Sequence, residues 1–305
     1  MSDSIVRVKN FKKIYGNLTA VDDISFEVKK GEIFGLLGPN GAGKTSALEC
    51  LEGLRTPSSG EIDIMGINPT KNPKKLKDMI GVQLQASGLP ESITVGEAME
   101  LFCAYHRISP RFDLLERFDL KSKISTQYSQ LSGGQQRRLA LALAVAHNPA
   151  LLILDEPTAA LDVQSRAELH EIMRELKESG TTIILATHDM AEAEKLSDRI
   201  AILLKGKLVT LGTPKEITAA GSALTKVSVR TSSGCLKETE TKFKDTSNFT
   251  LNEDYYIYYT SEPGKLVSQI IDYINSQGDS LIDLRVERPS LEERFLEITD
   301  VGGAR

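Results

Sequence analysis

A glycine-rich loop near the start of the chain constrains its fold more than any other feature. Gly38 is followed by four residues and then by Gly43, Lys44 and Thr45, which fits the phosphate-loop pattern G-x-x-x-x-G-K-[ST]. A nearly all-apolar run at residues 32–37 precedes the loop, and a helical pattern follows it. The loop therefore joins a buried strand to a helix N-terminus, which indicates a covered, mostly parallel sheet.

The residue types in this loop suit a nucleoside triphosphate. Glycines let backbone N–H groups turn inward around phosphate oxygens, and the helix N-terminus adds the positive end of its dipole. Lys44 can reach the β- and γ-phosphates, and the Thr45 hydroxyl can bind Mg²⁺. The predicted phosphate-binding residues are Gly38, Pro39, Asn40, Gly41, Ala42, Gly43, Lys44, Thr45 and Ser46. The loop alone does not choose among kinase, GTPase, helicase and transporter.

Two acidic residues follow a second apolar strand pattern at residues 151–154. In a parallel sheet, ligands bind at the carboxyl ends of the strands, so Asp155 and Glu156 are expected beside the phosphates. Asp155 is suited to hold Mg²⁺ through water, and Glu156 to orient or deprotonate the attacking water. A pair of acids that merely caps a helix is the alternative.

The remaining patterns predict an α/β fold in the first part of the chain. Strand patterns alternate with helical ones, which is typical of a parallel sheet covered by helices. The expected elements are strands at residues 5–9, 24–28, 182–186 and 199–204, a helix at 165–179, and a mostly helical segment at about 86–148.

Small residues at 219–223 mark a domain boundary, so we expect one domain at 1–218 and a second at 222–305. The second contains strand and helix patterns typical of a small α+β domain, and its last helix opens with a capping-box pattern at Ser290 and Glu293. Its expected elements are strands at residues 226–230, 255–259 and 281–286 and helices at 265–275 and after 290.

The segment Leu131-Ser132-Gly133-Gly134-Gln135 decides among the triphosphate-binding classes. It resembles the signature motif of ATP-binding cassette (ABC) ATPases. Ser132 and the two glycines can offer a hydroxyl and backbone N–H groups to a phosphate at the start of a helix. Taken alone, the segment is equally typical of an ordinary loop.

Four more positions occur in the order of the ABC family. Tyr15 resembles the aromatic residue that stacks on adenine, and Asp162 resembles the D-loop residue that communicates between paired cassettes. Gln85 resembles the Q-loop glutamine near the γ-phosphate, Mg²⁺ and attacking water, with Gln83 as the alternative. His188 resembles the switch histidine that contacts the γ-phosphate. Singly, they read as a strand-edge aromatic, a helix cap, a solvated loop glutamine and a strand-end histidine.

The resemblance covers about residues 3–218 and implies an ATPase that uses ATP and Mg²⁺. One ATP would lie between two cassettes, with the phosphate loop of one facing the signature motif of the other, so a homodimer is expected. Glu156, His188 and Gln85 would be catalytic, and Thr45, Gln85 and Asp155 would hold the metal. Ala159 and Ala160 precede the D-loop where serine is common, which puts one contact across the dimer in doubt.

The resemblance further implies a separate membrane-spanning permease, with the coupling surface around residues 85–94 and the helical segment behind it. The ending at residues 288–297 resembles the S-L-E-x-x-F-L ending of drug- and polysaccharide-exporter cassettes, which favours an exporter. The transported substrate cannot be deduced from this chain.

Charge and composition exclude several other functions. The net charge of −5 opposes broad binding of nucleic acid, and no guanine-recognition motif of the N-K-x-D type is present. No apolar run reaches the roughly 18 residues that span a bilayer, and the start lacks the layout of a signal peptide. We expect a cytoplasmic protein that is peripheral to the membrane through its permease. A soluble ABC ATPase that works on ribosomes or DNA is the second hypothesis.

Overall fold

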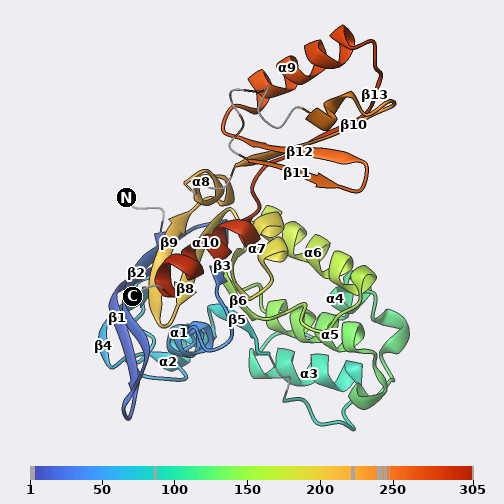
Figure 1. Ribbon diagram of the computed structural model, residues 1–305. Coiled ribbons are helices and arrows are strands. Elements are labelled where there is room, and N and C mark those ends of the chain that lie inside the picture. Colours follow the sequence, from blue (N-terminus) through green and yellow to red (C-terminus); the bar gives the residue numbers. More distant parts are fainter. Residues whose placement is uncertain are drawn as a thin grey trace. The chain divides into compact units, whose positions relative to one another are not determined.

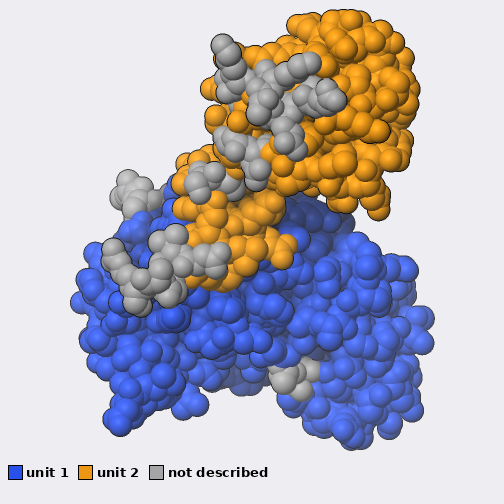
Figure 2. Space-filling view, viewed as in Figure 1, with its two compact units in different colours: residues 1–214 blue, residues 215–305 orange. Residues whose placement is uncertain are grey.

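The computed structural model describes residues 4–85, 88–220, 224–238, 243, 246 and 248–303. The chain folds as two compact units, Met1–Pro214 and Lys215–Arg305 (Figure 2). The small-residue segment at 219–223 follows this division, and its residues 221–223 lie outside the described part of the chain.

The first unit is built on a six-stranded sheet with the order β5-β6-β7-β3-β8-β9. All neighbouring strands are parallel except β8 and β9, which form an antiparallel pair. The central strands are buried along their whole length, as the apolar runs predicted. The strands are β3 (Ile33–Leu37), β5 (Ile80–Gln83), β6 (Leu151–Asp155), β7 (Thr182–Thr187), β8 (Arg199–Leu204) and β9 (Lys207–Gly212).

A three-stranded antiparallel sheet covers one face of this sheet, with α1 between the two (Figure 1). Leu151 and Ile153 of β6 point to this side and share its core with Leu48 and Leu51 of α1. The elements of this layer are β1 (Ser4–Tyr15), β2 (Leu18–Lys29), β4 (Ser59–Ile64), α1 (Lys44–Leu51) and α2 (Pro73–Lys77).

Helices cover the other face of the six-stranded sheet (Figure 1). Leu152 and Leu154 of β6 point to this side, because successive residues of a strand face opposite ways. The middle of the unit is mostly helical, as predicted. The elements are α3 (Val95–Tyr105), α4 (Phe112–Arg117), η1 (Lys121–Lys123), η2 (Tyr128–Gln130), α5 (Gly133–Val145), α6 (Val163–Glu178) and α7 (Met190–Leu196).

The second unit contains an antiparallel sheet with the order β11-β12-β10-β13 and helix α9 packed on one face. Tyr256 and Tyr258 lie in the core beneath α9, whereas the Tyr255 hydroxyl donates to Asp283, so the tyrosine-rich strand has tyrosines on both faces, as predicted. The elements are α8 (Pro214–Ala219), β10 (Thr225–Thr231), η3 (Cys235–Glu238), β11 (Asn248–Asn252), β12 (Tyr255–Thr260), α9 (Pro263–Ser276), β13 (Leu281–Glu287) and α10 (Leu291–Gly303).

The start of α10 confirms the predicted capping box. The backbone N–H of Glu293 donates to the Ser290 hydroxyl at 3.2 Å, and the backbone N–H of Ser290 donates to the Glu293 carboxylate at 2.9 Å. Two otherwise unpaired donors of the helix end are thereby satisfied.

Candidate nucleotide-binding site

The phosphate loop joins β3 to α1 at the carboxyl end of the parallel sheet. Its backbone requires glycine at Gly43, which has φ 104°, and a Cβ there would lie 2.4 Å from the carbonyl oxygen of Ala20. A Cβ at Gly38 would lie 2.4 Å from the carbonyl oxygen of Leu203. These close approaches fix the loop against its neighbours, so that α1 begins at Lys44 with its N-terminal N–H groups directed at the loop.

A cavity of about 520 Å³ lies over this loop. It brings together most of the residues that the sequence assigned to nucleotide and catalysis, from segments far apart in the chain. Its lining is Tyr15, Leu18, Thr19, Ala20, Pro39, Asn40, Gly41, Ala42, Gly43, Lys44, Thr45, Ser46, Gln85, Asp155, Glu156, Lys205 and Gly206.

Lys44 is held in place by the loop itself. Its ammonium donates to the carbonyl oxygens of Gly38 at 2.6 Å and Pro39 at 3.4 Å. It also lies 3.5 Å from Oε1 of Glu156, and both side chains are buried. A lysine fixed in this way presents its charge to the cavity at little further entropic cost.

Asp155 ends β6, Glu156 follows it directly, and both residues line the cavity. Burial, and then the neighbouring Glu156 carboxylate, raise the pKa of Asp155, while Lys44 opposes the rise. Glu156 has a left-handed backbone with φ 49°, and its N–H donates to Ala186 of β7 at 2.9 Å. Its side chain is therefore placed by the end of β6 and by β7.

Asp155 has the chemistry of a cation ligand. The Thr45 hydroxyl donates to its Oδ2 at 3.4 Å, and its Oδ1 is buried without a hydrogen-bond partner among the described residues. A buried polar atom of this kind calls for a partner. Hydroxyl and carboxylate oxygens are the ligands that Mg²⁺ prefers, so Thr45 and Asp155 fit this ion.

His188 follows β7 and meets Glu156. Its Nδ1 lies 2.8 Å from Oε2 of Glu156, and about half of its side chain is exposed. Of the two glutamines considered, Gln85 lines the cavity. Gln83 lies in β5, where both polar atoms of its buried amide have no partner among the described residues.

Tyr15 lies at the end of β1 on the cavity wall. Its hydroxyl donates to Glu49 at 3.4 Å, and the Lys13 ammonium lies 4.7 Å from the centre of its ring. A half-exposed aromatic ring in this position offers a flat surface to a base.

The signature segment and Asp162 lie outside the lining of this cavity. The Ser132 hydroxyl caps α5 by accepting from the backbone N–H of Gln135 at 3.2 Å. In turn, the Gln135 side-chain oxygen accepts from the backbone N–H of Ser132 at 3.0 Å. Asp162 caps α6 through Ser165, and a Cβ at Gly134 would lie 2.6 Å from the Ser165 hydroxyl.

Two capped helix ends therefore lie side by side. Ser132 and Gly133 are exposed at the first of them, where backbone N–H groups of α5 face solvent. An exposed helix N-terminus of this kind can bind an anion presented by another molecule.

Several lining residues were missed by the sequence reasoning. Lys205 and Gly206 form the tight turn between β8 and β9, both with positive φ, and the N–H of Gly206 donates to Ala42 of the loop. A Lys-Gly pair between two strand patterns indicates a turn. Nothing in it says that the turn closes one side of the cavity.

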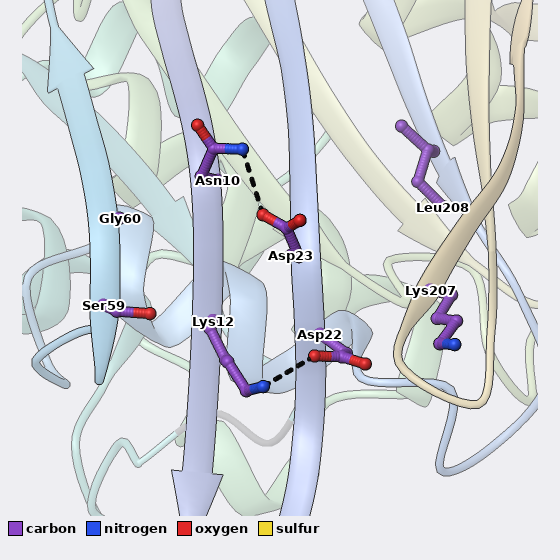
Figure 3. Close-up of a pocket in the computed structure, with 8 residues that line it drawn as sticks. All are labelled: Asn10, Lys12, Asp22, Asp23, Ser59, Gly60, Lys207 and Leu208. Atoms are coloured by element: carbon purple, nitrogen blue, oxygen red, sulfur yellow. Dashed lines mark hydrogen bonds and ion pairs between the residues drawn. The ribbon is translucent and has the colours of Figure 1, made fainter.

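A second hollow of about 730 Å³ lies on the antiparallel sheet and does not match the predicted site (Figure 3). Four of its polar side chains pair with each other: Lys12 forms an ion pair with Asp22 at 2.8 Å, and the Asn10 amide donates to Asp23 at 3.0 Å. Because these groups already satisfy one another on an open surface, the hollow offers a ligand little.

The comparisons with known proteins agree with this geometry. The family model described as ABC transporter matches residues 21–159. The Nod factor export ATP-binding protein I of Rhizobium johnstonii is 33% identical over 98% of this chain and 96% of its own length. The chain belongs to the ABC transporter family. The linearmycin resistance ATP-binding protein LnrL of Bacillus subtilis is 32% identical to this cassette over 97% of the cassette and 98% of LnrL.

Solved cassettes share the fold of the first unit. The protein cbiO1 from Clostridium perfringens, part of the ABC transporter complex cbiONQ, has a TM-score of 0.65 and 30% identity over 72% of this chain and 92% of its own. A dimeric post-hydrolysis state of the cassette MJ0796 bound to ADP and Pi has a TM-score of 0.62 and 28% identity over 68% and 98%. This cassette is thus an ATP-binding and ATP-hydrolysing subunit of an ABC transporter. No helix in its described part is long and apolar enough to cross a membrane.

Proposed function

We propose that this cassette works as a homodimer that powers export through a separate membrane permease, with one ATP between each phosphate loop and the partner copy's signature motif. The observation that supports it most is the division of the site. Lys44, Glu156 and Gln85 line the cavity, whereas Ser132 and Gly133 are exposed at a capped helix end outside it. A second copy would supply the missing donors.

In this proposal each residue of the cavity, and His188 beside it, has one task. Lys44 neutralises charge on the β- and γ-phosphates, and Tyr15 stacks on the adenine. Glu156 orients the attacking water and accepts its proton. His188 donates Nδ1–H to Glu156, which holds the carboxylate in position. Mg²⁺, held by Thr45, Asp155 and Gln85, would supply charge neutralisation of the phosphates when bound.

Replacement of Glu156 tests the catalytic assignment. Glu156→Gln should lower the rate of phosphate release by roughly a hundredfold or more, because the amide cannot accept a proton. ATP binding should persist, so the ATP-bound dimer should accumulate on size-exclusion chromatography. Glu178→Gln, at an exposed position at the end of α6, is the matched control and should hydrolyse ATP normally. A native rate in Glu156→Gln would show that Glu156 is not the base.

We further propose that the permease docks in a groove of about 490 Å³ between β5, α3 and α5. Large apolar side chains are exposed along it, among them Leu54 at 53%, Leu101 at 56% and Tyr105 at 66%. Exposed apolar side chains gathered in one groove are typical of an interaction site. The groove is lined by Leu84, Gly88, Leu89 and Pro90, and Leu84 directly precedes Gln85 of the nucleotide site.

Docking is tested by recovery from detergent-solubilised native membranes in the presence of ATP. The tagged protein should bring down a polytopic membrane protein in stoichiometric amount, and Leu101→Glu should abolish this recovery. The control Val163→Glu changes a side chain that is 85% exposed outside the groove and should leave recovery unchanged. Recovery with ribosomes or DNA alone would contradict the transport proposal and leave the ATPase assignment intact.

Export is favoured by the names of two relatives that match along nearly their whole length, an export protein and a resistance protein. Through its permease the cassette would lie on the cytoplasmic face of the membrane. We propose for residues 222–305 that they stabilise the homodimer or contribute to docking.

A further inference from the structure

Two side chains from separate segments meet at one buried oxygen of Glu192. The Thr158 hydroxyl donates to Oε1 of Glu192 at 2.5 Å, and Nε2 of His170 lies 3.1 Å from the same atom. All three residues are less than 5% exposed. Thr158 follows β6, His170 lies on α6, and Glu192 lies in the first turn of α7. No function has so far been assigned to this cluster.

The cluster lies close in sequence to Glu156, which lines the cavity, and to His188, which contacts Glu156. Thr158 is separated from Glu156 by Pro157 alone, and Glu192 lies one helical turn after His188. The bond between Thr158 and Glu192 therefore ties together the two segments that carry Glu156 and His188. Those two side chains make their own contact at 2.8 Å, so the same pair of segments is joined twice.

Helix α6 adds a second connection to the same place. Arg166 of α6 pairs with Asp189 at 3.2 Å, and Asp189 caps α7 by accepting from the N–H of Glu192 at 2.9 Å. With His170, α6 thus holds the first turn of α7 at two points. His188 immediately precedes that turn, so its position depends on α6.

The other end of this connection lies at the signature motif. The N-cap of α6 is Asp162, which binds the N–H of Ser165 at 2.9 Å. Gly134 of α5 packs so closely on Ser165 that a Cβ would not fit without movement. Packed contacts and hydrogen bonds thus run without a break from α5 through α6 to α7.

We propose that Thr158, His170 and Glu192 are positioning residues that set the contact between His188 and Glu156 and make it respond to α6. The inference rests on the proposed roles of Glu156 and His188. Leaving a buried carboxylate oxygen without a hydrogen-bond donor costs free energy. The arrangement in which Oε1 of Glu192 keeps both of its donors is therefore favoured. Nδ1 of His170 and Oε2 of Glu192 have no partner among the described residues, so only Oε1 ties the three segments together.

Thr158→Val tests the proposal, because it keeps the shape of the side chain and removes only the donor. The turnover number should fall by about tenfold, since a small misplacement of catalytic groups is costly, while KM for ATP stays within about twofold. Thr158→Ser, which keeps the hydroxyl, should restore the rate. His170→Leu should also lower the turnover number, and it serves as the test variant if Thr158→Val does not fold.

Thr182→Val is the matched control for loss of a buried threonine bond. The Thr182 hydroxyl is fully buried at the other end of β7 and accepts from the N–H of Gly31 at 2.9 Å. This variant should lose stability much as Thr158→Val does, as measured by thermal melting, but should keep the native turnover number.

A spectroscopic measurement separates this inference from the proposed function. The imidazole nitrogen resonances of His188, assigned by their loss in His188→Asn, should move in Thr158→Val and His170→Leu but not in Thr182→Val. Unchanged resonances together with an unchanged turnover number in Thr158→Val would overturn the inference. If Glu156→Gln hydrolysed ATP normally, the proposed catalytic role of Glu156 would fail, yet the resonances would still report whether the cluster positions His188.

Discussion

Lys44 and Glu156 form a buried ion pair across the nucleotide cavity, with 3.5 Å between Nζ and Oε1. Asp155 lies next to Glu156, so two carboxylates share one lysine. The lysine that is proposed to bind phosphate thus also compensates the acids that are proposed to hold the metal and activate water. When a nucleotide binds, its phosphates would contact Lys44 and its metal ion would contact the carboxylates, in place of the present contact between Lys44 and Glu156.

Lys44→Met should therefore affect binding and stability together. Affinity for a fluorescent ATP analogue should fall by about tenfold or more, because a charge-assisted contact to phosphate is lost. The pKa of Asp155, already raised, should rise further, since Lys44 opposes that rise. A carboxyl whose pKa is raised in the folded state contributes to the free energy of unfolding at low pH, and this contribution is lost as pH rises. Urea unfolding should thus show a larger loss at about pH 8 than at about pH 5.5.

Lys205→Met is the matched control for this prediction. Lys205 also lines the cavity, but it is exposed and no ion pair joins it to Glu156. Its loss should weaken ATP binding by less than about threefold and leave the pH dependence of stability unchanged. Equal effects of the two substitutions would contradict a special role for Lys44.

The paired glycines of the signature motif give a second prediction. Gly134 is buried, and a Cβ there would meet the Ser165 hydroxyl at 2.6 Å, whereas a Cβ at Gly133 would find only Leu161 at 4.0 Å. Gly134→Ala should lower the free energy of unfolding by about 1–3 kcal/mol through overpacking. Gly133→Ala should not lower it, because alanine favours the helix.

Hydrolysis should distinguish the dimer proposal from this packing effect. Both alanine variants should lower the rate of hydrolysis if backbone N–H groups of α5 approach a phosphate of the partner copy's ATP. A native rate in the stable Gly133→Ala variant would contradict that approach. Calorimetry and phosphate release, measured on the same samples, check both statements.

The parts of the fold that were predicted are those with continuous local signals. The buried strands β3, β6 and β7 are uninterrupted apolar runs, and the phosphate loop and the Asp155-Glu156 pair are each contiguous in sequence. Two strands at the edges of sheets, β9 and β4, were missed. β9 is half exposed with alternating polar residues, and β4 begins with three exposed residues, so neither carries a strong apolar pattern.

The missed site residues depend on tertiary placement instead. Lys205 closes the cavity from a turn, and Thr158, His170 and Glu192 meet from three segments. Asp162 shows the converse case. It is a helix cap, as its local sequence also suggested, and this does not conflict with a role at the dimer face. Sequence patterns revealed the residues that stand in recognisable motifs, and missed those that only the folded chain brings together.

Glu52 is a buried acid that the sequence did not single out, and it gives a third prediction. It ends α1, is 4% exposed and lines the groove between β5, α3 and α5. Burial, and then the nearby Asp155, raise its pKa from 4.5 to about 7. The folded protein therefore binds an extra proton between these values and loses stability as pH rises from about 4.5 to about 7.

Glu52→Gln should remove this loss. Relative to the native protein, the variant should gain roughly 3 kcal/mol in free energy of unfolding between about pH 4.5 and about pH 8, with most of the gain below pH of about 7. Urea unfolding at a series of pH values measures it. The exposed Glu178→Gln should follow the native curve. A constant difference between Glu52→Gln and the native protein at every pH would contradict the raised pKa.

The second unit has a core of its own, which gives the last prediction. Ile270 of α9 is fully buried in that core, whereas its neighbour Ile271 is 38% exposed. Ile270→Ala should cost about 2–5 kcal/mol, and Ile271→Ala much less. Because the residues of the nucleotide cavity all belong to the first unit, ATP should raise the melting temperature of one transition in Ile270→Ala and leave an earlier, weakened transition unmoved. A single transition that shifts as a whole with ATP would mean that the stability of the second unit depends on the first. If the rate of hydrolysis fell with Ile270→Ala but not with Ile271→Ala, residues 222–305 would take part in dimer closure.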